Sequence, residues 1–164
     1  MSEGSASHEA RNVANHDGQS TDQSPWLRYL RRYFVFVAGT NLIWEFAQIP
    51  LYTIWKEGSA GEIVFAAVHC TGGDILIAGA CLIGSLAIVG TDQWPNRGYR
   101  RVAMLMIASG LGYTIFSEWL NTEIRGSWAY SDIMPLVPFI EAGLSPLMQW
   151  ILVPVGAFWW MRRT

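Results

Sequence analysis

Four long apolar segments alternate with short polar connections along this chain. A helix that crosses a hydrocarbon core of about 30 Å needs about 20 mostly apolar residues, and each segment is long enough. The pattern predicts an all-α integral membrane protein, a four-helix bundle, with helices over residues 33–55, 62–89, 102–121 and 136–161. Apolar residues make up 51% of the chain and charged residues only 15%, so an ordinary soluble domain is not expected.

The first 24 residues differ from the rest of the chain. They are rich in Ser, Asn, Asp, Gln and Gly and contain hardly any apolar side chain. Such a composition buries too little surface to offset the entropy of ordering the chain. We therefore expect residues 1–24 to form a disordered polar tail and residues 25–164 to form the transmembrane domain.

Arginines gather at three of the five polar flanks and set the expected orientation. The basic flanks contain Arg28, Arg31 and Arg32, then Arg97, Arg100 and Arg101, and finally Arg162 and Arg163. The other two connections contain only Lys56 and Arg125. The positive-inside rule then places both termini in the cytoplasm and predicts a multi-pass protein of the cell membrane. Because the basic residues match these topology signals, no nucleic-acid partner is expected.

Polar side chains recur at helical spacing inside the apolar segments. Asn41, Glu45 and Gln48 fall at i, i+4 and i+7, which places them on one face of the first helix. The third helix repeats the pattern with Thr114, Glu118 and Asn121, the fourth has Glu141, Ser145 and Gln149, and the second has His69 and Asp74. We expect these stripes to face one another around a polar cavity in the outer half of the bundle, because lipid offers them no hydrogen-bond partner.

The intramembrane acids are the strongest indication of function. Inserting a charged residue costs roughly 2.5–3.5 kcal/mol, whereas a polar contact between membrane helices contributes only about 0.6 kcal/mol on average. Glu45, Asp74 and Glu118 are therefore predicted to do chemical work. A carboxyl group shielded from water favours its neutral form and can serve as a proton donor.

Two neighbouring features refine this prediction. His69 is the only histidine outside the tail and could shuttle protons at the same cavity. Imidazole and carboxylates could also hold Zn, Fe or Mn, but no two of these residues have a recognised metal-ligand spacing, so no metal site is predicted and no cofactor is named. Trp128 and Tyr130 in the connection before the fourth helix are interpreted either as a lid over the cavity or as part of an interfacial aromatic belt.

The string Asn41-Leu-Ile-Trp44-Glu45, followed by Pro50, resembles the Asn-x-x-Trp-Glu segment of integral-membrane terpene cyclases from fungal meroterpenoid pathways. The resemblance covers residues 41–50 and implies that Glu45 takes part in acid catalysis on an epoxide or alkene. Those cyclases are larger and have more helices, so their second acid is not placed here. The same residue types are similar to those of small membrane isomerases of the emopamil-binding type, although no contiguous motif is shared.

These observations lead to one functional prediction and two alternatives. The prediction is an enzyme that cyclises or isomerises a lipid-like or isoprenoid substrate by acid–base chemistry. The expected catalytic residues are Glu45, Asp74, Glu118 and His69, and the expected substrate-binding residues are Asn41, Trp44, Gln48, Asn121, Trp128, Tyr130 and Gln149. The alternatives are a proton-coupled or metal-ion transporter and an accessory subunit of a larger complex. Membrane lipids are expected partners, and Gly84, Gly110 and Gly112 offer surfaces through which the chain could form a homo-oligomer.

Overall fold

The computed structural model describes residues 25–90 and 94–163, and the predicted tail lies outside this part. Apart from single β-bridges, the described part has only helices as regular structure. Four of them are long and apolar enough to cross a membrane: Trp26–Leu51, Ala60–Val89, Tyr99–Ile124 and Leu144–Met161. The prediction of an all-α chain with four such helices is confirmed.

The first helix begins and ends earlier than predicted. Helix α2 spans Pro25–Gln48 and is followed by the 3₁₀ turn η1, Ile49–Leu51, and the short helix α3, Ile54–Glu57. The predicted range 33–55 is wrong at both ends. The start is earlier because a proline fits the first helical position, where its missing N–H needs no partner. The end is earlier because Pro50 cannot donate a backbone hydrogen bond and so stops the α-helix.

The second helix lies close to its predicted range. Helix α4 spans Ala60–Val89. Ser59 and Glu62 form a capping box at its start, in which the Glu62 carboxylate accepts from the Ser59 backbone N–H at 2.8 Å and the Ser59 hydroxyl accepts from Glu62 N–H at 3.4 Å. Such a box satisfies two backbone donors that have no partner within the helix. It therefore explains why the helix begins two residues before the predicted range.

The last two helices differ more from the prediction. Helix α5 spans Tyr99–Trp119 and continues as a π-helical turn, η2, over Leu120–Ile124. Helix α6 spans Leu144–Met161, so the predicted start at residue 136 is wrong. Residues 125–143 form a folded loop in which Phe139 and Glu141 have positive φ angles of 71° and 50°. Two positions in this loop precede prolines, which disfavours the helical backbone there.

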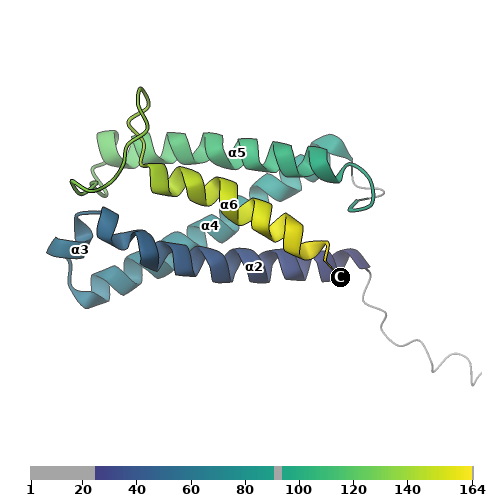
Figure 1. Cartoon of the computed structure of the whole chain (residues 1–164), viewed down its shortest axis with the longest axis horizontal. Helices are drawn as coiled ribbons and strands as arrows, with labels where there is room; N and C mark the ends of the chain where they lie inside the picture. Colours follow the sequence, from purple (N-terminus) through teal and green to yellow (C-terminus); the bar gives the residue numbers. More distant parts are fainter. Residues whose placement is uncertain (1–24, 91–93, 164) are drawn as a thin grey trace, which may run out of the picture.

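The four long helices form a ring. Helix α2 packs against α4 and α6, and α5 packs against the same two helices (Figure 1). In Figure 1, α6 crosses in front of the pair α2 and α5, and α4 crosses behind it. The 125–143 loop lies at the same end as α3, whereas the start of α2 and the end of α6 lie at the opposite end. We call these the loop end and the terminal end of the bundle.

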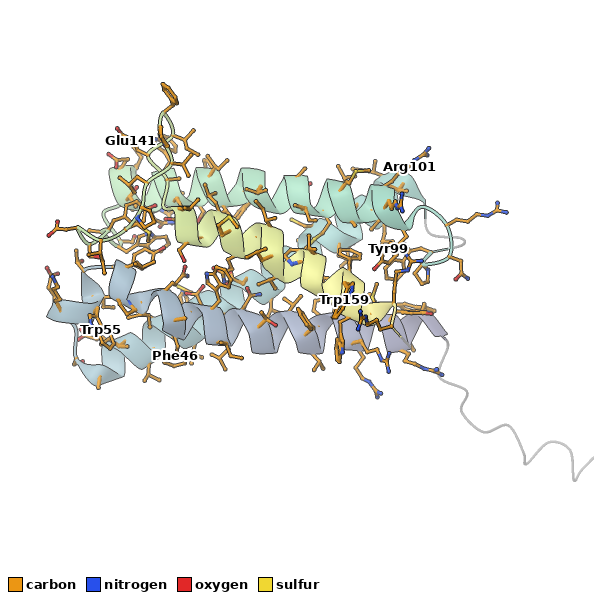
Figure 2. All side chains as sticks on the ribbon, viewed as in Figure 1. Phe46, Trp55, Tyr99, Arg101, Glu141 and Trp159 are labelled. Atoms are coloured by element: carbon orange, nitrogen blue, oxygen red, sulfur yellow. The ribbon has the colours of Figure 1, made fainter. Side chains whose placement is uncertain are left out.

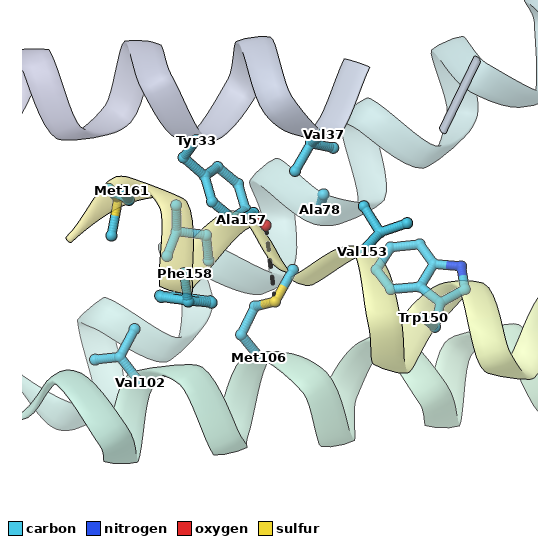
Figure 3. Packing of buried hydrophobic residues seen from close by; sticks show 11 residues of the cluster. Tyr33, Val37, Ala78, Val102, Met106, Trp150, Val153, Ala157, Phe158 and Met161 are labelled. Atoms are coloured by element: carbon cyan, nitrogen blue, oxygen red, sulfur yellow. Dashed lines mark hydrogen bonds between the residues drawn. The ribbon is translucent and has the colours of Figure 1, made fainter. Parts of the chain in front are cut away.

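An apolar core fills the terminal half of the bundle. Its buried members come from all four long helices and are Tyr33, Val37, Ala78, Leu82, Val102, Met106, Trp150, Val153, Ala157, Phe158 and Met161 (Figure 3). The Tyr33 hydroxyl donates to the Met106 sulfur at 3.7 Å. A Cβ on Gly110 would lie 2.3 Å from Cε3 of Trp150, so only glycine allows this indole to pack against α5. Gly110 is therefore used within the chain rather than on an oligomer surface.

The outer surface of the bundle is apolar as well. On the helices α2, α4 and α5, the large apolar side chains with more than three fifths of their surface exposed are Val35, Ile43, Phe65, Leu76, Ile83, Ile88 and Met104. Apolar exposure on this scale is unusual for a soluble monomer and fits a surface covered by lipid.

Candidate functional site

A cluster of buried polar side chains lies between α2, α4 and α6. Its centre is the side-chain nitrogen of Gln149, which lies 2.9 Å from Asn41 Oδ1, 2.9 Å from Glu45 Oε1 and 3.0 Å from Asp74 Oδ2. Asn41, Glu45 and Gln149 are each less than 8% exposed. We refer to Asn41, Glu45, Gln48, Asp74, Ser145 and Gln149 as the amide–acid cluster. Three helices that are distant in the sequence thus place two acids around a single amide.

A chain of hydrogen bonds extends the cluster toward Trp44. Gln48 Nε2 donates to Glu45 Oε1 at 2.8 Å and to Gln149 Oε1 at 3.3 Å. The Ser145 hydroxyl donates to Gln48 Oε1 at 2.9 Å, and the indole N–H of Trp44 donates to Ser145 Oγ at 3.2 Å. Because each side-chain amide both donates and accepts, the orientation of the two glutamines is set by their partners.

The number of donors at the centre of the cluster is smaller than the number of acceptors. A glutamine Nε2 carries two hydrogens, yet three oxygen atoms lie within hydrogen-bond distance of Gln149 Nε2. The Glu45 and Asp74 carboxyl groups are neighbours, because an oxygen of each lies within 3.0 Å of the same nitrogen. A proton on one of these two acids supplies the missing donor, and it also removes the repulsion between two adjacent carboxylates. The geometry is therefore suited to holding one exchangeable proton between two carboxyl groups.

A second acid site adjoins the cluster at the loop end. The Tyr130 hydroxyl donates to Glu118 Oε2 and accepts from the backbone N–H of Gly143 at 2.9 Å. Tyr130 therefore ties the 125–143 loop both to α5 and to the start of α6. Burial and the neighbouring Glu118 raise the pKa of the Tyr130 phenol above its usual value. Its proton is consequently retained over the whole physiological range.

Trp128 of the same loop faces Glu118 but is not hydrogen-bonded to it. The indole nitrogen of Trp128 is buried and lacks a partner among the described residues. It lies near the Glu118 carboxyl group. Of the two loop aromatics, Tyr130 is thus hydrogen-bonded to an acid of the site and Trp128 is not.

Tyr52 is a neighbour of the site that the sequence prediction missed. Its ring lies 5.6 Å from that of Tyr130, and the two residues form a β-bridge. Burial, and then the charges of Glu118, Tyr130 and Glu45, raise the pKa of the Tyr52 phenol. Tyr52 lies within the predicted first helix, four residues after Gln48 on the same helical face, but the predicted site does not include it. In the structure it follows η1, outside the four apolar helices, and it reaches the site through its bridge to Tyr130.

Several predicted residues make local hydrogen bonds instead of joining the cluster. Asn121 is buried, and its amide donates to the Ser117 carbonyl oxygen at 2.8 Å and to the Ser117 hydroxyl at 3.2 Å. Thr114 donates to the carbonyl oxygen of Gly110 at 3.0 Å. Such bonds to the preceding turn satisfy a polar side chain without a partner from another helix.

The structure does not bring His69 or Glu141 to the cluster. His69 is exposed on α4, and its ring stacks on Phe65 at a centroid distance of 5.4 Å. Glu141 lies in the loop beside α5 and is exposed, because α6 begins only at Leu144 (Figure 2). The predicted stripe of Glu141, Ser145 and Gln149 is thus limited to its last two members.

The cluster is tightly packed in this conformation. A space of about 10 Å³ lies between Asn41, Gln149 and the apolar core residues Tyr33, Val37 and Trp150. This is about the volume that one water molecule needs. Over residues 25–90 and 94–163, no three His, Cys, Asp or Glu side chains are arranged to hold a metal ion. Any lipophilic substrate must therefore enter by displacing side chains or the adjoining loop.

Comparison of the chain with protein-family models, with curated proteins and with solved structures found no match. The function is therefore inferred from the geometry of the two adjoining acid sites.

Proposed function

We propose that this protein is a multi-pass enzyme of the cell membrane that cyclises or isomerises a lipophilic substrate, such as an isoprenoid, by acid–base chemistry. The observation that supports it is the placement of Glu45 and Asp74, from different helices, around the side-chain nitrogen of Gln149. Two adjacent carboxyl groups, of which Glu45 is buried and Asp74 is half-buried, can give a proton and take one back, which is what isomerisation of an alkene requires. The resemblance of residues 41–50 to membrane terpene cyclases points to the same role for Glu45.

The proposed reaction conserves protons. Glu45 donates its proton to an alkene or epoxide of the substrate and becomes a carboxylate, and a cation develops on the substrate. Loss of a proton from a neighbouring carbon to Asp74 forms the new double bond. Transfer of that proton from Asp74 to Glu45 restores the starting state, and the Gln149 amide holds both acids in position for the transfer. Asn41 and Gln48 orient the pair.

The position of the amide–acid cluster in one half of the bundle favours an enzyme over a carrier. The polar cluster is followed toward the terminal end by the apolar core around Tyr33, Met106 and Trp150. A carrier needs polar groups that continue toward both sides of the membrane. The inward orientation of the cluster within a single chain also differs from an accessory subunit, whose polar stripes would face outward to meet partner helices. His69 is left without a direct role, because it is exposed and stacked on Phe65.

The decisive experiment compares the wild-type protein with the Glu45→Gln variant. Each is purified with its native lipids, reconstituted in vesicles made from a membrane extract of the same cells, and incubated. Mass spectrometry before and after incubation should reveal a lipophilic compound that the wild type converts into an isomer. The Glu45→Gln variant should retain fold and insertion but lose at least 100-fold in rate, the low end of the contribution of a general acid.

Glu123→Gln is the matched control, because Glu123 is an exposed acid near the end of α5. It should leave the conversion unchanged. Equal conversion by the wild type and Glu45→Gln would reject Glu45 as the acid. The absence of any converted lipid in wild-type vesicles would count against an isomerase or cyclase of native membrane lipids.

A further inference from the structure

A groove at the terminal end of the bundle has no part in the proposed chemistry. It lies between α5 and α6, is open to the surface of the bundle, has a volume of about 520 Å³ and is lined by Tyr99, Ala103, Ile107, Val155, Phe158, Trp159, Arg162 and Arg163. Its volume falls within the range of about 300–1,000 Å³ that is usual for small-molecule sites. The amide–acid cluster contributes none of its residues.

The groove has an apolar wall and a basic mouth. Ala103, Ile107 and Val155 form the apolar part, and Val155 is half exposed. Arg162 and Arg163 follow the end of α6 beside them, and Figure 2 shows Tyr99 and Trp159 at this same end. The Tyr99 hydroxyl donates to the Phe158 carbonyl oxygen, which ties the two helices together at the groove.

Aromatic rings position both guanidinium groups. The Arg162 guanidinium carbon lies 4.7 Å from the centroid of the Tyr99 ring, and that of Arg163 lies 3.7 Å from the Trp159 ring. A cation–π contact uses the face of the guanidinium, so the N–H groups in its plane are free to bind an anion. Planar, forked donors of this kind match the oxygens of a phosphate.

The charges around the groove favour an anionic ligand. The basic flanks containing Arg28, Arg97 and Arg100 are at this end of the bundle, whereas the acids of the described part lie within residues 45–74 and 118–141. We propose that the groove binds one anionic phospholipid. Its phosphate lies between Arg162 and Arg163, and an acyl chain lies along Ala103, Ile107 and Val155. Both halves of the ligand are needed, because the groove pairs an apolar wall with a basic mouth.

Lipid retention in nanodiscs tests this proposal. The protein is reconstituted in phosphatidylcholine containing a minor fraction of phosphatidylglycerol, extracted with mild detergent, and examined by native mass spectrometry. The wild type should retain one phosphatidylglycerol per chain in preference to phosphatidylcholine. The double variant Arg162→Gln/Arg163→Gln should bind it roughly 30-fold more weakly, as expected when two arginines near a membrane surface are lost.

Matched variants separate a specific groove from general attraction to basic charge. Arg97→Gln/Arg100→Gln removes the same charge at the same end but outside the groove, and it should retain the lipid. Ala103→Phe fills the apolar wall with all charges intact and should lose the lipid. Met104→Phe, on the adjacent exposed face of α5, should not.

Three outcomes would overturn the proposal. Equal losses of phosphatidylglycerol from the two double arginine variants would mean that the lipid is held by diffuse electrostatic attraction. Retention of phosphatidylcholine as strong as that of phosphatidylglycerol would mean that the groove does not select an anion. Displacement of the lipid by water-soluble glycerol 3-phosphate would indicate a site for free phosphate compounds. Circular dichroism of each variant verifies that the helices are intact, and the Ala103→Phe result decides the case if the double arginine variant does not fold.

Discussion

Gln149 on α6 donates a hydrogen bond to Glu45 on α2 at 2.9 Å, 104 residues away in the sequence. The same nitrogen lies 3.0 Å from Asp74 on α4. One neutral amide thus connects two acids on different helices between α2, α4 and α6. The arrangement is at once structural, because it ties three helices together, and chemical, because it keeps two carboxyl groups within reach of one proton.

Replacing Gln149 should cost stability. Gln149→Leu removes the donor shared by Asn41, Glu45 and Asp74 and leaves buried acceptors without a partner, which should lower the free energy of unfolding by about 1–3 kcal/mol. Denaturation in mixed micelles measures this free energy of unfolding. Ser109→Leu, on the exposed face of α5, is the control and should change little. An unfolding free energy equal to that of the wild type would show that the cluster satisfies its acceptors in another way.

The shared proton should be visible by infrared spectroscopy. At neutral pH the wild type should show a carboxylic C=O stretching band, which a fully ionised pair would lack. Difference spectra of Glu45→Gln and of Asp74→Asn against the wild type should each show loss or displacement of this band, because either change alters the partner of the same proton. Glu123→Gln should leave the band in place. Identical spectra for the wild type and both cluster variants would contradict the inference that a proton on Glu45 or Asp74 supplies the hydrogen-bond donor missing at Gln149.

The packing of Trp150 predicts opposite effects for two glycines on the same helix. Gly110→Ala places a Cβ 2.3 Å from Cε3 of Trp150 and should destabilise the bundle by about 1–3 kcal/mol, as overpacking of a core usually does. Gly112 has no such neighbour within 4 Å. Gly112→Ala should therefore be neutral or stabilising by up to about 1 kcal/mol through helix propensity. Thermal unfolding of both variants in one detergent tests this, and equal effects would contradict the contact.

Tyr130 should hold the 125–143 loop closed. Tyr130→Phe removes the bonds to Glu118 and to the Gly143 N–H. A net loss of about 0.5–1.5 kcal/mol should raise hydrogen exchange in residues 125–143 roughly 2- to 10-fold, without a change in α2. Tyr113→Phe, at an exposed tyrosine of α5, should leave the loop unaffected. Unchanged exchange in Tyr130→Phe would mean that the backbone bridges alone close the loop.

The hydrogen bond between Tyr130 and Glu118 should weaken only in strong alkali. Because the pKa of Tyr130 is raised in the folded protein, its neutral form is favoured there, and the stabilisation is complete below the ordinary tyrosine pKa of about 10. As the pH rises above that value, the unfolded state ionises first and stability falls. The decline of loop protection above about pH 10 should therefore be smaller in Tyr130→Phe. Loss of protection near neutral pH would contradict the raised pKa.

The expected orientation can be tested by labelling. In a background with Cys70→Ala and Cys81→Ala, Lys56→Cys should react with a membrane-impermeant maleimide on intact cells, whereas Arg97→Cys should react only after lysis. Both positions are exposed in the structure. The reverse pattern would place both termini outside and the amide–acid cluster in the cytoplasmic half.

Hydrophobic patterning alone was sufficient to predict the four apolar helices. A helix in lipid must satisfy its backbone internally, so a long apolar run has few alternatives. The spacing of Asn41, Glu45 and Gln48 likewise determined one buried polar face of α2, because these positions repeat with the helical period. The helix ends were less predictable. Pro50 ended α2 early, and the prolines and positive φ angles before Leu144 delayed α6.

Only the tertiary structure decided which polar groups meet. Gln149, Glu45 and Asp74 come together because α6 and α4 both pack against α2, and the sequence spacing within one helix is silent about such packing. Packing also separated His69 from the acids and brought Tyr52 to them through a bridge between two loops. Periodicity specifies the face of a helix on which a side chain lies, whereas the rotation and crossing of the helices determine what that face contacts.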